Sequence, residues 1–285
     1  MYRGLSMSFR SMLAEIDRRP LYRHVTAVMW QRCLSIRSQF CDAVVQSGLL
    51  TWEQMVSAAC RYCVGATRKG GVIFWQIDRD GRVHDGKVMY YQTDCHRCKD
   101  EAHRPTWVSA ILRRRDPFPN APHATSHCFF GLHLIYETTD CTDSLTTNYT
   151  NYTNYSQDAQ PHSCNSLNSL SKKIIVLVEA EKTAFVLSER YPQYIWLAAG
   201  GLGEVQTDKF RQLRGHRVFM VPDTDPDGTA FRRWHEAAQA VMQSVFWEDS
   251  PPIHVSSFLE LNATPDQKQR KIDLLDYIME QNEQL

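Results

Sequence analysis

Residues 174–179, Ile-Ile-Val-Leu-Val-Glu, indicate the class of fold. Five consecutive apolar residues, most of them β-branched, are typical of a strand that is buried on both faces. Strands of this kind belong to parallel sheets, whose two faces are covered by helices. We therefore expect residues 174–178 to form an inner strand of an α/β sheet, with Glu179 directly at the carboxyl end of that strand.

Strand and helix patterns alternate through the rest of this region. The expected strands are 174–178, 194–199, 218–221 and 253–255, and the expected helices are 182–190, 207–214, 229–243 and 272–280. This order predicts an α/β domain over residues 172–285, in which a parallel sheet carries helices on both faces.

Acidic residues follow two of these strands. Glu179 follows the first, and Asp223 and Asp225 follow the third within the sequence PDTDPDG of residues 222–228. Open α/β sheets bind ligands at the carboxyl ends of their strands, so we expect these carboxylates to meet there, with Asp227 as a further candidate. Oxygen ligands suit Mg²⁺ or Mn²⁺. An ordinary Asp-Pro-Asp-Gly turn is the alternative interpretation.

Three segments of this region resemble the motifs of the Toprim domain, the catalytic module of bacterial-type DNA primases, topoisomerases and some nucleases. They are Ile174–Glu179, Leu197–Gly201 and Val218–Gly228, and they occur in the same order within residues 172–260. The motifs are most similar to those of the primase branch, in which a D-x-D-x-x-G motif opens the following helix, as residues 223–228 do here. It implies that Glu179 is a general acid or base and that Glu179, Asp223 and Asp225 hold Mg²⁺. Ala180 departs from the pattern, which usually has Gly there.

The whole chain is similar to a narrower, largely uncharacterised group of Toprim-bearing proteins related to mobile-element primases. The matching stretches are Tyr62–Thr67, Val72–Asp78, Gly86–Tyr90, Cys128–Leu134 and Val178–Ala184. The resemblance implies primase-like nucleotidyl transfer on single-stranded DNA, with nucleotides as substrates and a replicative helicase as a candidate partner. A Toprim nuclease and a non-catalytic nucleic-acid-binding accessory protein remain as alternatives.

The region before the α/β domain is expected to have three parts. Residues 1–62 are a helical, basic segment, with a helical pattern over 22–48 and a Thr51-x-x-Gln54 capping box that starts a second helix. Residues 63–140 are a small α+β domain, with strand signals on both sides of a turn at Gly81 and a short helix at 107–114. Residues 141–171, which contain a repeated Asn-Tyr-Thr, are a polar low-complexity linker.

The net charge of zero conceals an asymmetry. The 285 residues carry 32 Lys/Arg and 32 Asp/Glu, but residues 1–115 hold 19 basic against 10 acidic side chains. A basic half is an indication of a polyanionic partner. The candidates for nucleic-acid contacts are Lys69, Arg113, Arg114, Arg115 and Lys182. No apolar run reaches the roughly 18 residues of a membrane helix, and the N-terminus lacks the apolar core of a signal peptide, so we expect a cytoplasmic protein without a membrane anchor.

Two C-x-x-C pairs, Cys60/Cys63 and Cys95/Cys98, could form a Cys₄ zinc site if a β-hairpin brought them together. The interval between the pairs exceeds the roughly 15–20 residues that are usual between such pairs. We therefore favour ordinary thiols, with structural zinc as the alternative.

Overall fold

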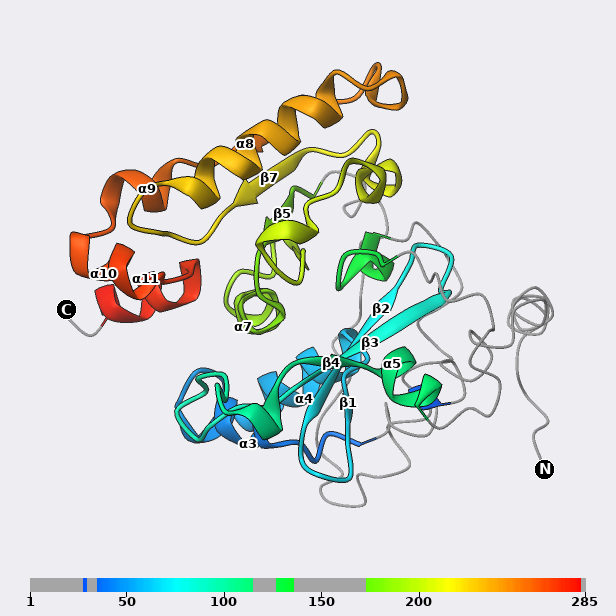
Figure 1. The fold of residues 1–285 in the computed structure, drawn as a ribbon, viewed down its shortest axis with the longest axis vertical. Helices are drawn as coiled ribbons and strands as arrows, with labels where there is room; N and C mark the ends of the chain where they lie inside the picture. The colour runs from blue at the N-terminus through cyan, green and yellow to red at the C-terminus, as the bar shows by residue number, and fades with distance from the viewer. Residues whose placement is uncertain (1–27, 30–34, 115–126, 136–172, 283–285) are drawn as a thin grey trace. The chain divides into compact units, whose positions relative to one another are not determined.

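The computed structural model describes residues 28–29, 35–114, 127–135 and 173–282, which belong to two compact units (Figure 1). Among the described residues, those up to His127 belong to the first unit, and Cys128–Ile135 and the residues from Lys173 onward belong to the second. The architecture is mixed: the first unit has an antiparallel sheet and the second a parallel sheet. No described helix combines the length and apolar character that crossing a bilayer requires.

The first unit is built on a four-stranded sheet in the order β1-β2-β3-β4. The strands are β1 (Gly65–Ala66), β2 (Val72–Ile77), β3 (Val83–Met89) and β4 (Thr106–Trp107). The helices with described bounds that accompany them are α3 (Gln39–Gln46), α4 (Trp52–Arg61), α5 (Val108–Arg113) and the short 3₁₀-helix η1 (Glu101–His103). The expected strands, the turn at Gly81, which has φ of 75°, and the helix near 107–114 are confirmed.

Strand β2 is buried along its whole length because both of its faces are covered. Trp75 belongs to an apolar cluster that includes Val88 of β3 and Val108 of α5. Phe74 points to the other face, where its ring lies 5.2 Å from that of Phe40 of α3, centroid to centroid. Residues 38–62 therefore pack on the sheet and form one unit with it, rather than a separate helical segment.

Local hydrogen bonds explain where the first helices begin. The helical pattern over residues 22–48 does not form one continuous helix, because Ser38 adopts an extended backbone and its side chain accepts the Cys41 N–H as the N-cap of α3. The capping box at α4 is confirmed: Gln54 N donates to Thr51 Oγ1 at 3.2 Å, and Thr51 N donates to Gln54 Oε1 at 3.0 Å.

Helix α5 has its N-terminal cap on a neighbouring strand. Its own N-cap residue, Trp107, offers no side-chain hydrogen bond. Instead the carboxylate of Asp85, a fully buried residue of β3, accepts the Ser109 N–H at 3.0 Å and also the Ser109 hydroxyl. Asp85 Oδ1 further accepts its neighbour Gly86 N–H at 2.7 Å. This carboxylate therefore joins β3 to the first turn of α5.

The second unit contains a parallel sheet in the order β6-β5-β7-β8. The strands are β5 (Ile175–Val178), β6 (Ile195–Ala198), β7 (Val218–Val221) and β8 (His254–Val255). The helices are α7 (Glu181–Arg190), α8 (Thr229–Met242), α9 (Phe258–Asn262), α10 (Pro265–Arg270) and α11 (Leu274–Asn282). All four expected strands are confirmed to within one residue.

Helices cover both faces of this sheet, as expected. Ile175 and Leu177 of β5 pack in one apolar cluster with Trp234 of α8 and Phe210. The alternate residues of β5 are also buried and face the other way, where α7 packs against β5 and β6. Figure 1 shows α7 and α8 on opposite sides of β5.

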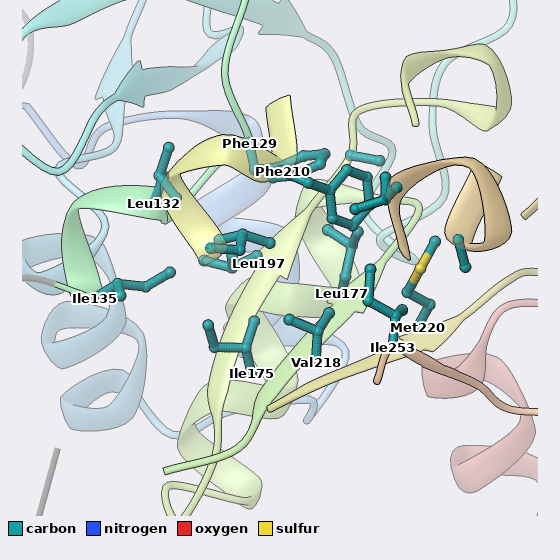
Figure 2. Packing of buried hydrophobic residues seen from close by; sticks show 14 of the residues in the cluster. Phe129, Leu132, Ile135, Ile175, Leu177, Leu197, Phe210, Val218, Met220 and Ile253 are labelled. Atoms are coloured by element: carbon teal, nitrogen blue, oxygen red, sulfur yellow. The ribbon is translucent and has the colours of Figure 1, made fainter. Parts of the chain in front are cut away.

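Residues 128–135 were expected in the small α+β domain, but they belong to the second unit. Phe130 pairs with Ala198 at the edge of β6 through two backbone hydrogen bonds of 2.9 and 3.1 Å. Phe129, Leu132 and Ile135 are buried in the core of the sheet, and the Phe129 ring lies 5.1 Å from that of Phe210 (Figure 2). Packing against the sheet determines the position of residues 128–135, and no local sequence pattern predicts this packing.

The remaining helices and the proposed linker differ in outcome from the helix and strand predictions described so far. Residues 207–213 form a 3₁₀-helix, η5, where an α-helix was expected. Helices α9 and α10 were not predicted, although Thr264 and Gln267 form the same capping box as Thr51 and Gln54. The proposed linker, 141–171, lies outside the described residues.

Candidate metal centre

The carboxyl ends of β5 and β7 lie side by side. The two strands pair in parallel, with Val178 opposite Val221, so Glu179 and Pro222-Asp223 leave the same edge of the sheet. In the order β6-β5-β7-β8, the chain first moves from β5 to β6 on one side and then crosses to β7 on the other. Such a change of direction opens the crevice in which α/β sheets bind ligands.

A third segment, at the start of α11, is bound to the loop after β7 and to the first turn of α7. The backbone N–H and the hydroxyl of Thr224 both donate to the Ile272 carbonyl, at 3.0 and 3.1 Å. On the other side, the Thr183 hydroxyl donates to Asp273 Oδ2. Residues far apart in the sequence are therefore held around one point.

Asp273 and Asp276 bring two more carboxylates to this point. Asp273 Oδ1 accepts the Asp276 N–H at 2.8 Å, and Asp276 Oδ2 accepts the Asp273 N–H at 3.4 Å, which is the reciprocal pattern of a capping box. Both carboxylates face the Lys182 ammonium, at 3.3 Å from Asp276 and 3.9 Å from Asp273. Sequence reasoning missed both residues, although the D-x-x-D spacing at the expected helix start was a signal for at least their capping role.

Asp223 lies among these charges. Burial is the largest cause that raises its pKa well above the ordinary value, followed by the negative charges of Glu179, Asp273 and Asp276, while Lys182 acts in the opposite direction. The pKa of Asp276 is raised for similar reasons, first by burial and then by Asp273. The set thus consists of four carboxylates, those of Glu179, Asp223, Asp273 and Asp276, and the ammonium group of Lys182. An additional cation would therefore stabilise the ionised forms of these carboxylates.

Asp225, which was expected to hold the metal ion with Asp223, accepts hydrogen bonds from the backbone. Its Oδ1 accepts the backbone N–H groups of Asp227 and Thr229, at 3.1 and 2.9 Å, and its Oδ2 accepts that of Ala230. Burial acts to raise its pKa, but these backbone hydrogen bonds outweigh burial and lower it. Asp225 thus holds the turn before α8, where both of its oxygens accept backbone N–H groups. Asp227 is exposed, outside the group of carboxylates around Asp223.

The proposed nucleic-acid contacts have separate locations. Lys182 lies within the acidic group with its side chain 13% exposed, so it balances charge there. Lys69, Arg113 and Arg114 are exposed residues of the first unit, and Arg115 lies outside the described residues.

The four cysteines of the two C-x-x-C pairs do not form one group. Among the described residues, which include all four, the one set of three or more metal-ligating side chains with ligand atoms within 4.8 Å of one another is Cys98, Asp100 and His103. Cys60 lies at the end of α4, where burial raises the pKa of its thiol to about 11. Cys63 directs its sulfur to the Cys60 carbonyl, 3.6 Å away. The pattern of two pairs therefore does not become a Cys₄ site.

The donor set around Asp223 fits a hard divalent cation. Glu179, Asp223, Asp273 and Asp276 offer only oxygen atoms, which Mg²⁺ and Mn²⁺ prefer to sulfur or nitrogen. No hydrogen bond to the Asp223 carboxylate is found among the described residues, in contrast to Asp225.

No curated protein and no solved structure matches the chain. The family model described as "Domain of unknown function (DUF6371)" matches residues 38–144 and 140–224. These segments include the antiparallel sheet, strands β5 to β7, Glu179 and Asp223, and they end before Asp273. Because the match extends over more than half of the sequence, the chain belongs to the DUF6371 family.

Proposed function

We propose that this chain is a Mg²⁺-dependent enzyme of nucleic-acid metabolism, with Glu179 and Asp223 as the residues that hold the ion. The observation that carries the proposal is the meeting of these two carboxylates at the β5/β7 crevice, where Asp273 and Asp276 raise the local negative charge further. Mn²⁺ would occupy the same oxygen ligands.

The resemblance to Toprim domains supports a finer assignment, primase-like nucleotidyl transfer. Single-stranded DNA and nucleotides are the proposed substrates, and a replicative helicase is the candidate partner. The exposed cations of the first unit, including Lys69, Arg113 and Arg114, would bind phosphates of the template. We propose a cytoplasmic location for this activity.

Each residue of the centre has a distinct role in this proposal. Glu179, besides holding the ion with Asp223, accepts the proton of an attacking hydroxyl group. Asp223 directs its negative charge to the cation. Asp225 fixes the loop that carries Asp223, because its carboxylate accepts backbone N–H groups of the first turn of α8. Lys182 orients Asp273 and Asp276. The cation, when bound, supplies electrostatic stabilisation of the charge that develops on the transferred phosphoryl group.

The test is primer synthesis by the full chain with single-stranded DNA, NTPs and Mg²⁺. We expect Asp223→Asn and Glu179→Gln to lower the rate by on the order of 100-fold or more, because loss of groups that merely support a metal already costs 10- to 100-fold. Asp208→Asn, an exposed position of η5 with its side chain 85% exposed, is the matched control and should retain activity. Synthesis that is unchanged in both site variants would refute the proposal.

The same preparations separate the two alternatives. Mg²⁺-dependent cleavage of labelled DNA without NTPs would assign the centre to a nuclease. Salt-dependent DNA binding with neither synthesis nor cleavage would indicate a non-catalytic accessory protein.

A further inference from the structure

A second group of metal-ligating side chains lies in the first unit, on the loop between β3 and β4. The sulfur of Cys98, a carboxylate oxygen of Asp100 and a ring nitrogen of His103 all lie within 4.8 Å of one another. The group contains one residue of the two C-x-x-C pairs, with neighbours that the C-x-x-C pattern did not include. Nothing in the candidate centre around Asp223 uses these residues.

The backbone holds this loop in a defined shape. Cys98 N donates to the Tyr90 carbonyl at 2.9 Å, so the residue is bound to the end of β3. The turn before it is closed by Gln92 N, which donates to the His96 carbonyl at 2.8 Å. The hydrogen bonds therefore fix the position of Cys98 independently of any ligand.

Asp100 and His103 are positioned by the short helix η1. Asp100 is its N-cap, and Asp100 Oδ1 accepts the Ala102 N–H at 3.1 Å. His103 Nδ1 lies 2.8 Å from both oxygens of Asp100. The imidazole ring also packs on Tyr90, with ring centroids 4.7 Å apart. Tyr90 therefore supports the site at two points, through its carbonyl and its ring.

We propose that Cys98, Asp100 and His103 bind a zinc-class divalent cation. A thiolate, an imidazole and a carboxylate form a mixed donor set that Zn²⁺ accepts in tetrahedral geometry, whereas Mg²⁺ prefers oxygen alone. The side chains of Asp100 and His103 are 55% and 41% exposed, so water can supply the fourth ligand.

The geometry requires only a small adjustment. Two ligand atoms on one tetrahedral zinc ion, with bonds near 2.0–2.3 Å, lie about 3.6 Å apart. The hydrogen bond between Asp100 and His103 would lengthen, the Nδ1 proton would move to Nε2, and the thiol of Cys98 would release its proton to solvent. Without a cation, burial and then the charges of Asp100 and Asp94 raise the pKa of this thiol.

The loop gives a physical reason for such a site. Between β3 and β4 the chain forms only η1 and an isolated bridge between Tyr91 and Arg97, and most of its side chains are exposed. Apart from Tyr91 and Cys95, which are buried, the segment buries little apolar surface and so gains little from packing. Metal binding to the folded loop would stabilise it by mass action.

The experiment is titration of the full chain with Co²⁺ and then Zn²⁺ under reducing conditions. Cobalt reports its ligands: coordination by Cys98 gives a thiolate-to-cobalt charge-transfer band in the near ultraviolet, which oxygen ligands such as Glu179 and Asp223 cannot produce. We expect one equivalent of Co²⁺ to give this band and Zn²⁺ to displace it. Cys98→Ser should abolish the band, and His103→Gln should weaken Co²⁺ binding at least 10-fold.

Two variants serve as matched controls. Cys60→Ser removes a thiol outside the group, and His96→Gln removes an exposed imidazole from the same loop, so both should retain the band. Absence of the band in the folded wild-type protein, its survival in Cys98→Ser, or its equal loss in Cys60→Ser would overturn the proposal. If Cys98→Ser does not fold, unchanged Co²⁺ affinity in folded His103→Gln would overturn it as well.

Discussion

At the scale of single residues, the strongest prediction concerns Asp223. Because its pKa is raised in the folded state, the free energy of unfolding depends on pH. A carboxyl group with a raised pKa in the folded state binds its proton more tightly there than in the unfolded chain. Its favourable contribution is complete below the unfolded pKa of about 3.9 and is lost as the pH rises through the folded value. At pH 8 without metal, which is well above the unfolded pKa, Asp223 therefore destabilises the fold.

Asp223→Asn should remove this penalty. We expect a higher Tm than wild type at pH 8 in EDTA, by about 2–4 °C for each kcal/mol relieved, and convergence of the two proteins toward acid pH. Added Mg²⁺ should raise the Tm of the wild type and leave that of the variant nearly unchanged. Thermal unfolding across a pH series checks this, and a variant that is less stable at pH 8 would contradict it.

Asp225 should behave in the opposite way, although it stands only two residues further on. Its carboxylate accepts backbone N–H groups at the start of α8, so Asp225→Ala should destabilise the protein by about 1–2 kcal/mol, the usual effect of removing a helix cap. Urea unfolding measures this loss. Calorimetry on the folded variant should show nearly unchanged Mg²⁺ affinity, and a 100-fold loss would instead assign Asp225 to the metal.

The comparison of these two residues shows how far sequence reasoning could identify the candidate site. The position of Glu179 and Asp223 at the ends of buried strands followed from the apolar runs before them. The spacing of Asp223 and Asp225 could not predict that one carboxylate lies among other charges while the other caps α8. These roles depend on which backbone groups each side chain contacts. Asp276 was unpredictable for another reason, since it lies 94 residues from its partner Lys182.

At the scale of helices and strands, the cap on α5 predicts that strand β3 stabilises this helix, which can be tested by mutation. Asp85 is fully buried on β3, and its carboxylate satisfies the Ser109 N–H that Trp107 leaves without a side-chain partner. Asp85→Ala should leave this donor and the Ser109 hydroxyl unsatisfied and cost at least about 2 kcal/mol. Urea unfolding of the full chain measures the loss.

The control for this change is Asp80→Ala in the adjoining turn. The Asp80 carboxylate is 60% exposed and pairs with Arg82, so its removal should alter stability by less than about 1 kcal/mol. Equal losses in the two variants would contradict a specific role for Asp85. Most strands and the capping box of α4 were predicted from local patterns, whereas this contact between β3 and α5 joins residues that are 24 positions apart.

At the scale of the whole molecule, the division into units differs from the one that composition predicts. Charge and the polar segment 141–171 placed the boundary after residue 140, yet the chain contributes Cys128–Ile135 to the parallel-sheet unit. A run of eight residues is too short to show from sequence which of two cores will accept it. The contacts of Phe130 with β6 and of Phe129 with Phe210 decide the matter.

This division predicts which fragment will fold. Residues 128–285 should unfold cooperatively in urea, because they contain the whole core of the parallel sheet. Residues 136–285 lack five buried apolar side chains, those of Cys128, Phe129, Phe130, Leu132 and Ile135. Burial of a Phe, Leu or Ile side chain contributes roughly 1.5–3 kcal/mol. Residues 136–285 also leave the Ala198 backbone without its two hydrogen bonds to Phe130.

Since domains are stable by only about 5–15 kcal/mol, we expect the shorter fragment, residues 136–285, to be largely unfolded. Circular dichroism and urea titration distinguish the two fragments. Equal stability of 136–285 and 128–285 would mean that the segment is an accessory to the sheet and not part of its core.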